Sequence, residues 1–586
     1  MNDHSPHQAL SQSTGFTSLD IEFAKFLQRK QPSDDPRHSW LAALTSHQWG
    51  RGHACLDLEA LQHQAATLLG WNDAQVAALP ADLHTAAATM PWTQGEASPL
   101  KKHQARLYLR RAWTAEQSIR HHLSERLALP CPTPADLKQR LDVLFTPQAN
   151  HSTNEPDQQR LACEVAAQNR ITLITGGPGT GKTTTVVKLL SLLVGASPQD
   201  LRIHLAAPTG KAAARLSESI RQALTHMPEE VRHRIPTHAQ TLHRLLQTPT
   251  LAADVVIVDE ASMIDLEMMA KLLHAVPLHA RLILLGDKDQ LASVEAGAVM
   301  SQLCSGTLLQ HQTVTLTHSH RFNANSGIGQ WAQAVNAPHT MDNTTELKTL
   351  WNQAPEWTAS LTETPDVTRL QWHHAGDTQL AAALKQGWKK WLALLADVAT
   401  SGCNDAQALA LLNAFSEFCV LCALRDGPLG VTQLNAHVEQ ALGFGSRTWY
   451  AGRPVMVTRN DYALGLMNGD MGLCLADCNG LMRVAFPQID ATSGESTVRW
   501  VMPSRLESVE TVFAMTVHKS QGSEFSHVLL VLPAQESAVL SRELVYTGLT
   551  RARQRLTLWA PQLGVLLNAC KRRVIRSGGL ALDPLE

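Results

Sequence analysis

The chain has 586 residues, of which 44% are hydrophobic, and its formal net charge is −2 at pH 7. At about 150 residues per domain, this length predicts three or four globular domains. Because positive and negative charges nearly balance, the net charge does not indicate a nucleic-acid partner. Any nucleic-acid site must therefore be a local groove. No apolar run approaches the ~18 residues of a membrane span, and the polar start of the chain lacks a secretory pattern. We therefore expect a cytoplasmic protein with no membrane partner.

The first 150 residues predict a mainly helical domain. An amphipathic pattern at 107–119 indicates a helix, and prolines separate such patterns. Its arginines are expected on a solvated face over a core face rather than on a binding surface. They are Arg110, Arg111 and Arg120. The polar stretch 146–157 is typical of a linker, so we expect a domain 1–150 that ends there.

From about residue 158 short apolar strands alternate with helical patterns. The predicted strands are 171–175, 203–207, 255–258 and 282–285. This alternation predicts a doubly wound parallel sheet with its sites at the carboxyl ends of the strands. A second α/β unit follows about residue 330, with predicted strands at 512–516, 528–532 and 556–560. The expected domains are 151–336 and 337–586.

Residues 449–511 differ from both α/β units. Short runs of alternating apolar and polar residues are separated by glycine turns. Asn468-Gly469 and Asn479-Gly480 are typical of β-hairpin turns. These features predict a small β-barrel inserted into the second α/β unit.

The stretch 171–185 predicts a phosphate-binding loop. An apolar strand leads into G-x-x-x-x-G-K-T, and a helical pattern follows, so an ordinary glycine turn is disfavoured. Glycines let backbone N–H groups surround an anion. Lys182 would reach the β- and γ-phosphates, and the Thr183 hydroxyl would bind Mg²⁺. The residues expected to hold the nucleotide here are Gly176, Gly177, Pro178, Gly179, Thr180, Gly181, Lys182, Thr183 and Thr184.

Two adjacent carboxylates, Asp259 and Glu260, follow the strand 255–258. Asp259 is suited to hold Mg²⁺, and Glu260 to polarise an attacking water. Acids at this position could instead cap a following helix. The phosphate loop in the same unit favours the hydrolytic interpretation.

Three more residues fit hydrolysis of a nucleoside triphosphate. Gln290 follows the strand 282–285, where an amide can contact the γ-phosphate or its water. Arg321 and Arg551 offer planar cations for the charge on that phosphate. If both arginines come from outside the first sheet, the nucleotide lies in a cleft that closes on binding. Isolated arginines are more often surface ion-pair partners, so spacing alone leaves both interpretations open.

The ten cysteines include two close pairs, Cys419/Cys422 and Cys474/Cys478. We interpret the first pair as part of an apolar helical stretch, where cysteine acts as a small hydrophobe. The second pair has no nearby histidine. Structural thiols are therefore favoured over a zinc site.

In this order, the motifs resemble those of superfamily 1 DNA helicases, and most closely the RecD-type alpha subunits of exonuclease V (RecBCD). The matching segments are GGPGTGKT, APTGKAAARL, TLHRLL, VDEASM, GDKDQL, HRF, TVHKSQGSEF and VYTGLTRAR. The resemblance covers about residues 158–560. It implies an α/β fold with two RecA-like P-loop motor domains, a helical N-terminal domain and an SH3-like insertion.

The same resemblance implies an activity and further residues. ATP and Mg²⁺ would drive 5′→3′ movement on single-stranded DNA. Gln159 would contact adenine, and Glu524 would lie near the nucleotide sugar or phosphate.

A DNA track needs contacts to the backbone that ignore sequence. Suitable residue types stand at the matching motif positions: Thr209, Lys211, Thr241, His243, Thr516, His518 and Lys519. Capping of a helix or strand is the alternative role for each of them.

The N-terminal segments RGHACLDL and RLYLRRAW resemble the RecBCD alpha-subunit domain that docks on the gamma subunit. The leading hypothesis is therefore a motor of a heterotrimer with RecB-like and RecC-like subunits, acting on duplex ends in double-strand-break repair by homologous recombination. No constellation of carboxylates indicates a nuclease, so cleavage is expected of a partner. One alternative is a stand-alone helicase of the same fold. Another is an assembly protein that ATP merely gates, which the full set of hydrolytic residues disfavours.

Overall fold

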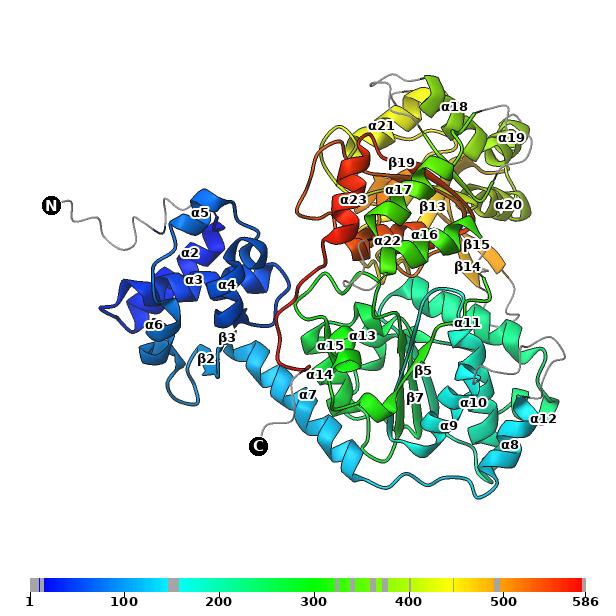
Figure 1. Ribbon diagram of the computed structural model, residues 1–586. Helices are drawn as coiled ribbons and strands as arrows, with labels where there is room; N and C mark the ends of the chain where they lie inside the picture. Colours follow the sequence, from blue (N-terminus) through cyan, green and yellow to red (C-terminus); the bar gives the residue numbers. More distant parts are fainter. Residues whose placement is uncertain are drawn as a thin grey trace.

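The computed structural model describes residues 10, 15–145, 157–321, 326–337, 343–358, 365–370, 378–399, 402–445, 447–489 and 496–581. Nearly all of the predicted linker 146–157 lies outside these residues. An N-terminal unit lies beside two α/β units that are stacked one above the other (Figure 1).

The N-terminal unit is largely helical. Its elements are α2 (Ser18–Lys30), α3 (Pro36–Gly50), β1 (Leu56–Asp57), α4 (Leu58–Leu69), α5 (Asp73–Ala77), α6 (Leu83–Thr89), η1 (Pro91–Thr93), β2 (Leu100–His103), β3 (Arg106–Leu109), α7 (Arg110–Ala128) and α8 (Leu137–Leu144). Within the described chain, three of these strands pair antiparallel in the order β1-β3-β2.

The helix predicted at 107–119 begins later, at Arg110. Leu107 and Tyr108 belong to β3, where Leu107 pairs with both neighbouring strands. Their side chains are buried in the sheet, which outweighs the continuous helical pattern. The solvated-face prediction holds for Arg111, whose side chain is 59% exposed. It is wrong for Arg120, whose side chain is 11% exposed and lies against Glu116.

Helix α7 and the end of the chain connect the units. Ile119 and Leu123 of α7 pack in one apolar cluster with Leu272 of the first α/β unit. Residues 572–581 run back from the second α/β unit along this junction (Figure 1). There Ser577 O accepts a hydrogen bond from Ala54 N at 2.8 Å. The C-terminal segment thus fastens the N-terminal unit to both α/β units.

The first α/β unit has a sheet that is parallel throughout. Among the residues described, its six strands follow the order β6-β5-β7-β8-β4-β9. They are β4 (Ile171–Gly176), β5 (Ile203–Ala207), β6 (Gln240–Thr241), β7 (Val255–Val258), β8 (Arg281–Gly286) and β9 (Thr313–Leu316). The four predicted strands are confirmed as β4, β5, β7 and β8. Of these, β4 and β7 are buried on both faces, as their continuous apolar runs predict. The edge strands β6 and β9 were not predicted.

Helices cover both faces of this sheet. They are α9 (Gln158–Gln168), α10 (Lys182–Ala196), α11 (Gly210–Leu224), α12 (Glu229–Arg232), α13 (Leu242–Leu245), η2 (Ala261–Met263), α14 (Leu266–Ala275), α15 (Val299–Ser305) and η3 (Gln310–Gln312).

The second α/β unit repeats this plan. In its described part, five parallel strands follow the order β10-β19-β18-β11-β17. They are β10 (Val367–Arg369), β11 (Phe418–Cys422), β17 (Ala514–Thr516), β18 (Phe525–Val531) and β19 (Ala552–Trp559). The helices are α16 (Gly327–Asn336), α17 (Thr344–Gln353), α18 (Thr378–Gly387), α19 (Lys389–Val398), α20 (Asp405–Ser416), α21 (Val431–Leu442), η5 (His518–Ser520), α22 (Arg542–Thr550) and α23 (Leu563–Lys571).

The helical interpretation of the stretch around Cys419 and Cys422 is wrong. Both residues lie in β11, inside the sheet, and are buried. A short run that is apolar on every face fits a buried parallel strand as well as a buried helix, so the pattern was ambiguous. Among the described residues, no group of three or more His, Cys, Asp or Glu side chains is placed to hold a metal ion.

An antiparallel sheet lies inside the second unit, within the predicted insertion. In the described chain its five strands follow the order β15-β14-β13-β12-β16. They are β12 (Pro454–Val457), β13 (Met471–Ala476), β14 (Met482–Ile489), β15 (Ser496–Val501) and β16 (Val509–Thr511), with η4 (Pro503–Arg505). Gly469 and Gly480 have positive φ in the connections where hairpin turns were predicted. Closure into an SH3-like barrel stays a prediction, as do the domain boundaries.

No helix in the described part of the chain is both long and apolar enough to span a membrane.

Candidate active site

The loop between β4 and α10 forms a tight cradle. Gly179 and Gly181 have φ of +78° and +83°, a conformation that favours glycine. A Cβ at Gly179 would lie 2.3 Å from the Cβ of Arg321. One at Gly181 would lie 2.2 Å from Nε2 of Gln159. Glycine is therefore required at both positions, and the loop closes directly against Arg321 and Gln159.

Lys182, the first residue of α10, folds back over this loop. Its Nζ donates hydrogen bonds to Gly176 O at 2.6 Å and to Gly177 O at 3.0 Å. Thr183 follows at the amino end of the helix, where free N–H groups and the helix dipole favour an anion. The ammonium group, the glycine loop and the helix end therefore converge on one phosphate-sized region.

Asp259 and Glu260 lie directly after β7. Glu260 has a φ of +52°, a left-handed conformation that costs a non-glycine residue about 1–3 kcal/mol. Its side chain makes no capping hydrogen bond to η2, which argues against the helix-cap alternative. Burial and the charge of Glu260 raise the pKa of Asp259, while Lys182 opposes the shift. A cation bound at Asp259 would stabilise its ionised form.

Asp287 orients the predicted γ-phosphate sensor. Its Oδ2 accepts a hydrogen bond from Gln290 Nε2 at 2.9 Å and another from the Tyr546 hydroxyl at 3.2 Å. Tyr546 belongs to α22 of the second unit, and its hydroxyl lies 2.8 Å from where a Cβ of Gly177 would be. Asp287 thus joins the phosphate loop, the sensor and the opposite unit.

Arg551 reaches the same sensor from the second unit. It is 1% exposed, and its Nη2 donates to Gln290 Oε1 at 2.8 Å. Nη1 donates to Ser523 O at 3.1 Å, which holds the guanidinium in place. Arg551 therefore comes from outside the first sheet, whereas Arg321 follows β9 of that sheet, so only one of the two arginines meets the stated condition.

Glu524 lies at the centre of an arginine cluster. Its carboxylate forms an ion pair with Arg215, a second with Arg321 at 2.7 Å and a third with Arg553 at 3.1 Å. Burial alone would raise the pKa of Glu524, but the charges of Arg215 and Arg321 outweigh it and hold that pKa at about 2. The carboxylate is therefore ionised throughout the neutral range.

The predicted catalytic residues all line one cleft between the two α/β units: Lys182, Asp259, Glu260, Gln290, Arg321 and Arg551. Most of the predicted nucleotide-binding residues line it too: Gln159, Pro178, Gly179, Thr180, Gly181, Thr183, Thr184 and Glu524. Gly176 and Gly177 instead contribute the carbonyl groups that hold Lys182. Gln159 stands at the mouth, where its Nε2 lies 3.2 Å from Nε2 of His320.

The donors in the cleft fit Mg²⁺ that arrives with a nucleotide. Mg²⁺ commonly takes one or two protein ligands and completes its shell with phosphate oxygens and water. The Asp259 carboxylate and the Thr183 hydroxyl both line the cleft and supply such a partial set.

The residues predicted to bind DNA on the first unit follow β5 and β6. Thr209 Oγ1 accepts a hydrogen bond from Ala212 N at 3.2 Å, so it caps α11. Thr241 Oγ1 caps α13 through Arg244 N at 3.3 Å. His243 is exposed. The capping alternative thus describes both threonines, and a capping hydroxyl keeps a lone pair for a second partner.

Lys211 lies where both α/β units meet the insertion. Its Nζ is 5.8 Å from the ring centroid of Phe525 and 3.7 Å from Sδ of Met471. Burial lowers its pKa. This lysine is therefore half-buried and partly covered by the second unit and the insertion.

In the second unit, Thr516 Oγ1 accepts a hydrogen bond from Lys519 N of η5 at 3.3 Å. Lys519 is exposed, and His518 is half-buried with a pKa lowered by burial. A DNA role for these residues stays a prediction.

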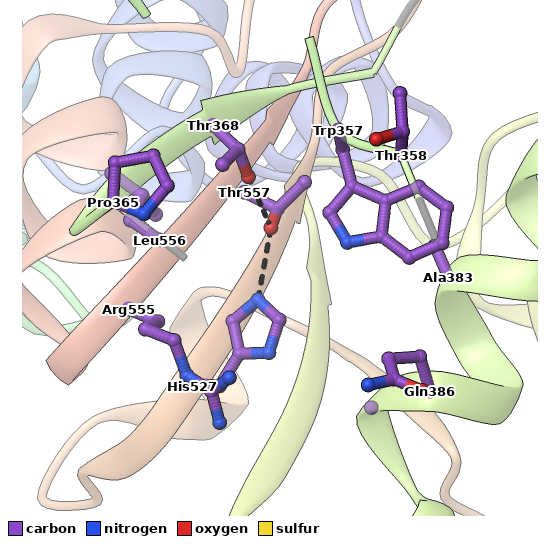
Figure 2. Close-up of a pocket in the computed structure, with 11 residues that line it drawn as sticks. Trp357, Thr358, Pro365, Thr368, Ala383, Gln386, His527, Arg555, Leu556 and Thr557 are labelled. Atoms are coloured by element: carbon purple, nitrogen blue, oxygen red, sulfur yellow. Dashed lines mark hydrogen bonds between the residues drawn. The ribbon is translucent and has the colours of Figure 1, made fainter. Parts of the chain in front are cut away.

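A second pocket lies at β10, β18 and β19 of the second sheet, around Thr368, His527 and Thr557 (Figure 2). His527 Nε2 and Thr557 Oγ1 are 2.9 Å apart, and burial lowers the pKa of His527 to about 3. None of the lining residues is acidic. The ring is therefore neutral, and the pocket lacks the carboxylates that hydrolysis needs.

Sequence reasoning missed two residues that line the cleft, Arg215 and Arg553. It also missed Asp287, which contacts Gln290, and Tyr546, which contacts Asp287. Arg215 interrupts an alanine-rich helix start, which is the one local signal for it. Its partner lies more than 300 residues away in the chain, so no local pattern could reveal the contact.

Three segments match models of known families. Residues 12–108 match the N-terminal domain of RecBCD enzyme subunit RecD. Residues 153–354 match an AAA domain, and residues 511–559 match a UvrD-like helicase C-terminal domain.

Several curated proteins are similar over most of the chain. The RecBCD enzyme subunit RecD of Mycobacterium tuberculosis is 36% identical over 98% of this chain and 96% of its own. The Haemophilus influenzae protein of the same name is 34% identical over 96% of each. The ATP-dependent RecD2 DNA helicase of Deinococcus radiodurans is 30% identical over 81% of this chain but 58% of its own. A Bacteroides Pif1 helicase structure with ADP-AlF3 and single-stranded DNA has 16% identity, covers 70% of this chain and 92% of its own, and has a TM-score of 0.36, too low to support a conclusion.

Proposed function

The chain belongs to the RecBCD enzyme subunit RecD family, and from this membership we propose that it is an ATP-driven 5′→3′ DNA helicase, one motor of a RecBCD-type helicase–nuclease. The observation that carries the proposal is the cleft itself. A phosphate loop and an acid pair of one parallel sheet face Arg551 and Glu524 of another. Hydrolysis in such a cleft can move two units against each other, which is what a translocating motor requires.

Each predicted catalytic residue has a role that its position supports. Lys182 neutralises the β- and γ-phosphate oxygens of ATP. Glu260, beside Asp259 at the end of β7, accepts a proton from the attacking water. Arg321 and Arg551 follow the negative charge as it develops on the transferred phosphoryl group.

Nucleotide and metal binding use the rest of the cleft. Gln159, at the mouth, contacts the adenine, and Glu524 lies near the sugar or phosphates. Thr183 and Asp259 would hold Mg²⁺, which when bound neutralises phosphate charge. The hydrogen bond from Arg551 to Gln290 spans the two units and supports a cleft whose closure depends on the γ-phosphate.

The DNA track runs along the carboxyl ends of the strands. Its residues are Thr209, Lys211, Thr241 and His243 of the first unit and Thr516, His518 and Lys519 of the second. The motor domains that carry it are 151–336 and 337–586, with the insertion at 449–511. The separate parallel sheets support this division.

The complex would contain RecB-like and RecC-like subunits and act on duplex ends in recombinational repair. The match of residues 12–108 to the RecD N-terminal domain supports a partner-binding role for residues 1–150. The stand-alone alternative has support from the RecD2 helicase of Deinococcus, although this chain spans 58% of that protein.

The test is to express the chain with and without candidate RecB-like and RecC-like subunits and to measure native mass and ATP-dependent unwinding. We expect a heterotrimer whose unwinding from a 5′ tail needs this chain. A monomer with full unwinding activity would instead identify a stand-alone helicase. A chain that binds ATP and assembles but never hydrolyses it would identify the gated assembly protein.

A further inference from the structure

Helix α11 joins two regions that the proposed function treats separately. Its amino end carries Thr209 and Lys211 of the predicted DNA track. Arg215, one turn further along, reaches the nucleotide cleft and lines it. The helix is fixed to its own sheet by Ala212 and Leu216, which are buried. A displacement of its amino end is therefore carried along a rigid element to Arg215.

Arg215 forms an ion pair that crosses the cleft. Its Nη2 donates to Oε1 of Glu524, which belongs to the second unit and directly precedes β18. The guanidinium also faces the acid pair. Burial would lower the pKa of Arg215, but the carboxylates of Glu524 and Glu260 outweigh it. Arg215 thus stands between the acid pair of its own unit and a carboxylate of the opposite one.

The loop that carries Glu524 rests on the first turn of α11. Gly522 has a φ of +72°, and a Cβ there would lie 3.3 Å from the Cβ of Ala212. Phe525 lies 5.8 Å from Nζ of Lys211. Contacts on both sides of Glu524 therefore touch α11 near the predicted DNA residues. When the two units shift, the start of this helix either keeps both contacts with the loop 522–525 or loses both.

Glu524 acts as an internal anion in the cleft. Arg215, Arg321 and Arg553 surround this carboxylate in the described chain. Guanidinium groups prefer carboxylate and phosphate alike, because both accept paired hydrogen bonds. A triphosphate in the same cleft would compete with Glu524 for these arginines.

We propose that Arg215 couples DNA binding at the start of α11 to the nucleotide cleft, by exchanging its ion pair with Glu524 for the bound triphosphate. In the resting state the pair holds Arg215 on the second unit. DNA at Thr209 and Lys211 moves α11, together with its sheet, away from the loop 522–525 and frees Arg215 for the phosphates. The coupling rests on the proposed helicase function and names the contact through which DNA would stimulate ATP hydrolysis.

The test compares ATPase rates of the full chain with and without an oligothymidylate single strand. The readout is the stimulation ratio, the rate with DNA divided by the rate without it. We expect Arg215→Gln to lower this ratio about 10-fold, within the usual range of coupling between two sites. Arg215→Lys should lower it about 3-fold, because an ammonium keeps the charge but loses the planar fork. Glu524→Gln should also lower the ratio, but by raising the rate without DNA, because Arg215 is released from its ion pair.

Arg553→Gln is the matched control. Arg553 contacts the same carboxylate, but it lies in β19, so its ion pair stays within the second unit. Because Arg553 also lines the cleft, this variant can lower the rates with and without DNA, but we expect it to lower both alike and to keep the wild-type ratio. An equal fall in Arg553→Gln and Arg215→Gln would overturn the proposal, because the contact across the cleft would then have no special role. A wild-type ratio in Arg215→Gln would overturn it too.

If Arg215→Gln does not fold, Arg215→Lys decides: a lowered ratio supports the coupling, and an unchanged ratio overturns it. Wild-type protein that hydrolyses ATP without any response to DNA would remove the proposed function itself. That result can be told from a failure of the coupling, because it is seen with the wild-type protein before any variant is measured.

Discussion

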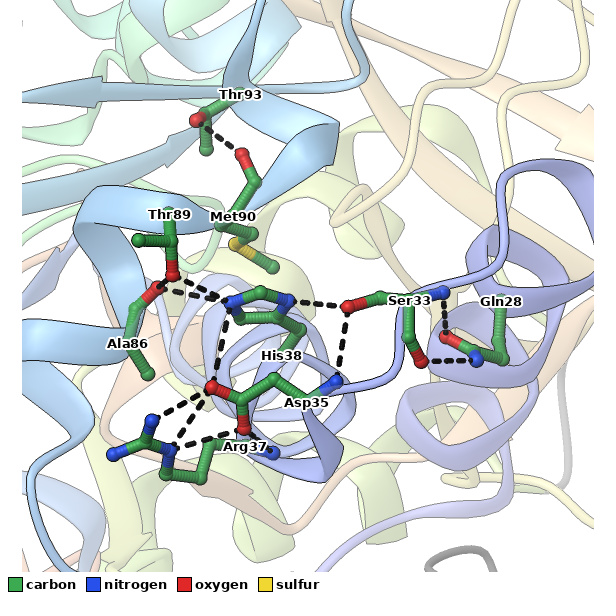
Figure 3. A network of polar contacts seen from close by, with 9 residues as sticks. All are labelled: Gln28, Ser33, Asp35, Arg37, His38, Ala86, Thr89, Met90 and Thr93. Carbon is green, nitrogen blue, oxygen red and sulfur yellow. Dashed lines mark hydrogen bonds and ion pairs between the residues drawn. The ribbon is translucent and has the colours of Figure 1, made fainter.

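The nucleotide cleft and the N-terminal unit each contain a polar network, and the two are built differently. In the N-terminal unit, buried His38 lies with Nδ1 2.6 Å from Ser33 Oγ and Nε2 3.0 Å from Ala86 O. Asp35 caps α3 and pairs with Arg37 at 2.7 Å (Figure 3). One cation meets one carboxylate, and these contacts stay inside one unit.

The cleft network has the opposite character. Glu524 receives Arg215, Arg321 and Arg553, and these residues come from both α/β units. The network borders a cleft rather than a packed core. Its cations can accept a further anion, whereas the His38 network has balanced charges.

Burial and polarity alone therefore do not identify a functional site. A balanced network held within one unit stabilises local structure. A network with surplus charge, joined across units and open to a cleft, is suited to a ligand that alters how the units meet. Variants in the two networks should therefore separate stability from turnover.

Lys182→Gln should reduce ATP turnover at least ~1000-fold, because the cradle loses the cation that follows phosphate charge. The melting temperature should hardly change, since Lys182 Nζ donates its hydrogen bonds to carbonyl groups of the loop itself. A phosphate-release assay with a melting curve checks both. Retained turnover would refute the assignment of this loop.

Arg551→Gln should lower the DNA-stimulated turnover about 100- to 1000-fold, as loss of a preorganised donor to a transition state does. ATP binding should weaken less, because Arg551 reaches the site from the opposite unit. Steady-state kinetics and equilibrium binding of a fluorescent ATP analogue separate the two effects. A change in binding alone would speak against a role in the chemical step.

The pH dependence of Mg²⁺·ATP binding should report Asp259. Its pKa is raised above the usual 3.8, so the carboxyl becomes protonated earlier than an ordinary aspartate as pH falls. Below that raised pKa, each pH unit should weaken the Mg²⁺-dependent part of binding roughly 10-fold, because a proton competes with the metal. Calorimetric titrations with Mg²⁺ and with EDTA measure this part directly. Equal pH profiles under both conditions would count against Asp259 as a metal ligand.

His38→Ala should cost about 2 kcal/mol of stability, because it leaves buried polar partners unsatisfied. ATP turnover per folded molecule should stay at the wild-type level, since His38 belongs to the other network. Urea unfolding and ATPase assays on the same sample test this prediction. A large loss of turnover without a loss of stability would erase the distinction between the two networks.

Much of the first α/β unit could be predicted because its signals are local. The glycine loop, Lys182 and Asp259 each follow directly on a buried strand. The stretch 418–422 was misread because a strand buried on both faces has no alternation to distinguish it from a buried helix. Residues 107–109 were misread because β3 runs straight into α7 without a break in the pattern.

The contacts across the cleft could not be predicted in the same way. Arg215 and Glu524 meet only because two units stack, and nothing in either local segment records that geometry. Phe525 and Met471 partly cover Lys211, and both lie far from it in the chain, so its surroundings could not be predicted either. Local patterns identified the chemistry, and tertiary packing determined which residues share it.

The most direct test of the motor assignment is a strand-polarity unwinding assay. Wild-type protein and Lys182→Gln are each assembled with the partner subunits, of which the RecB-like motor has been inactivated. Each complex is then given duplexes with a 5′ or a 3′ single-stranded tail. We predict ATP-dependent unwinding from the 5′ tail by the wild type and none by the variant, although both assemble. Unwinding from the 3′ tail alone, or equal unwinding by Lys182→Gln, would contradict the assignment of this cleft as the fuel site of a 5′→3′ motor.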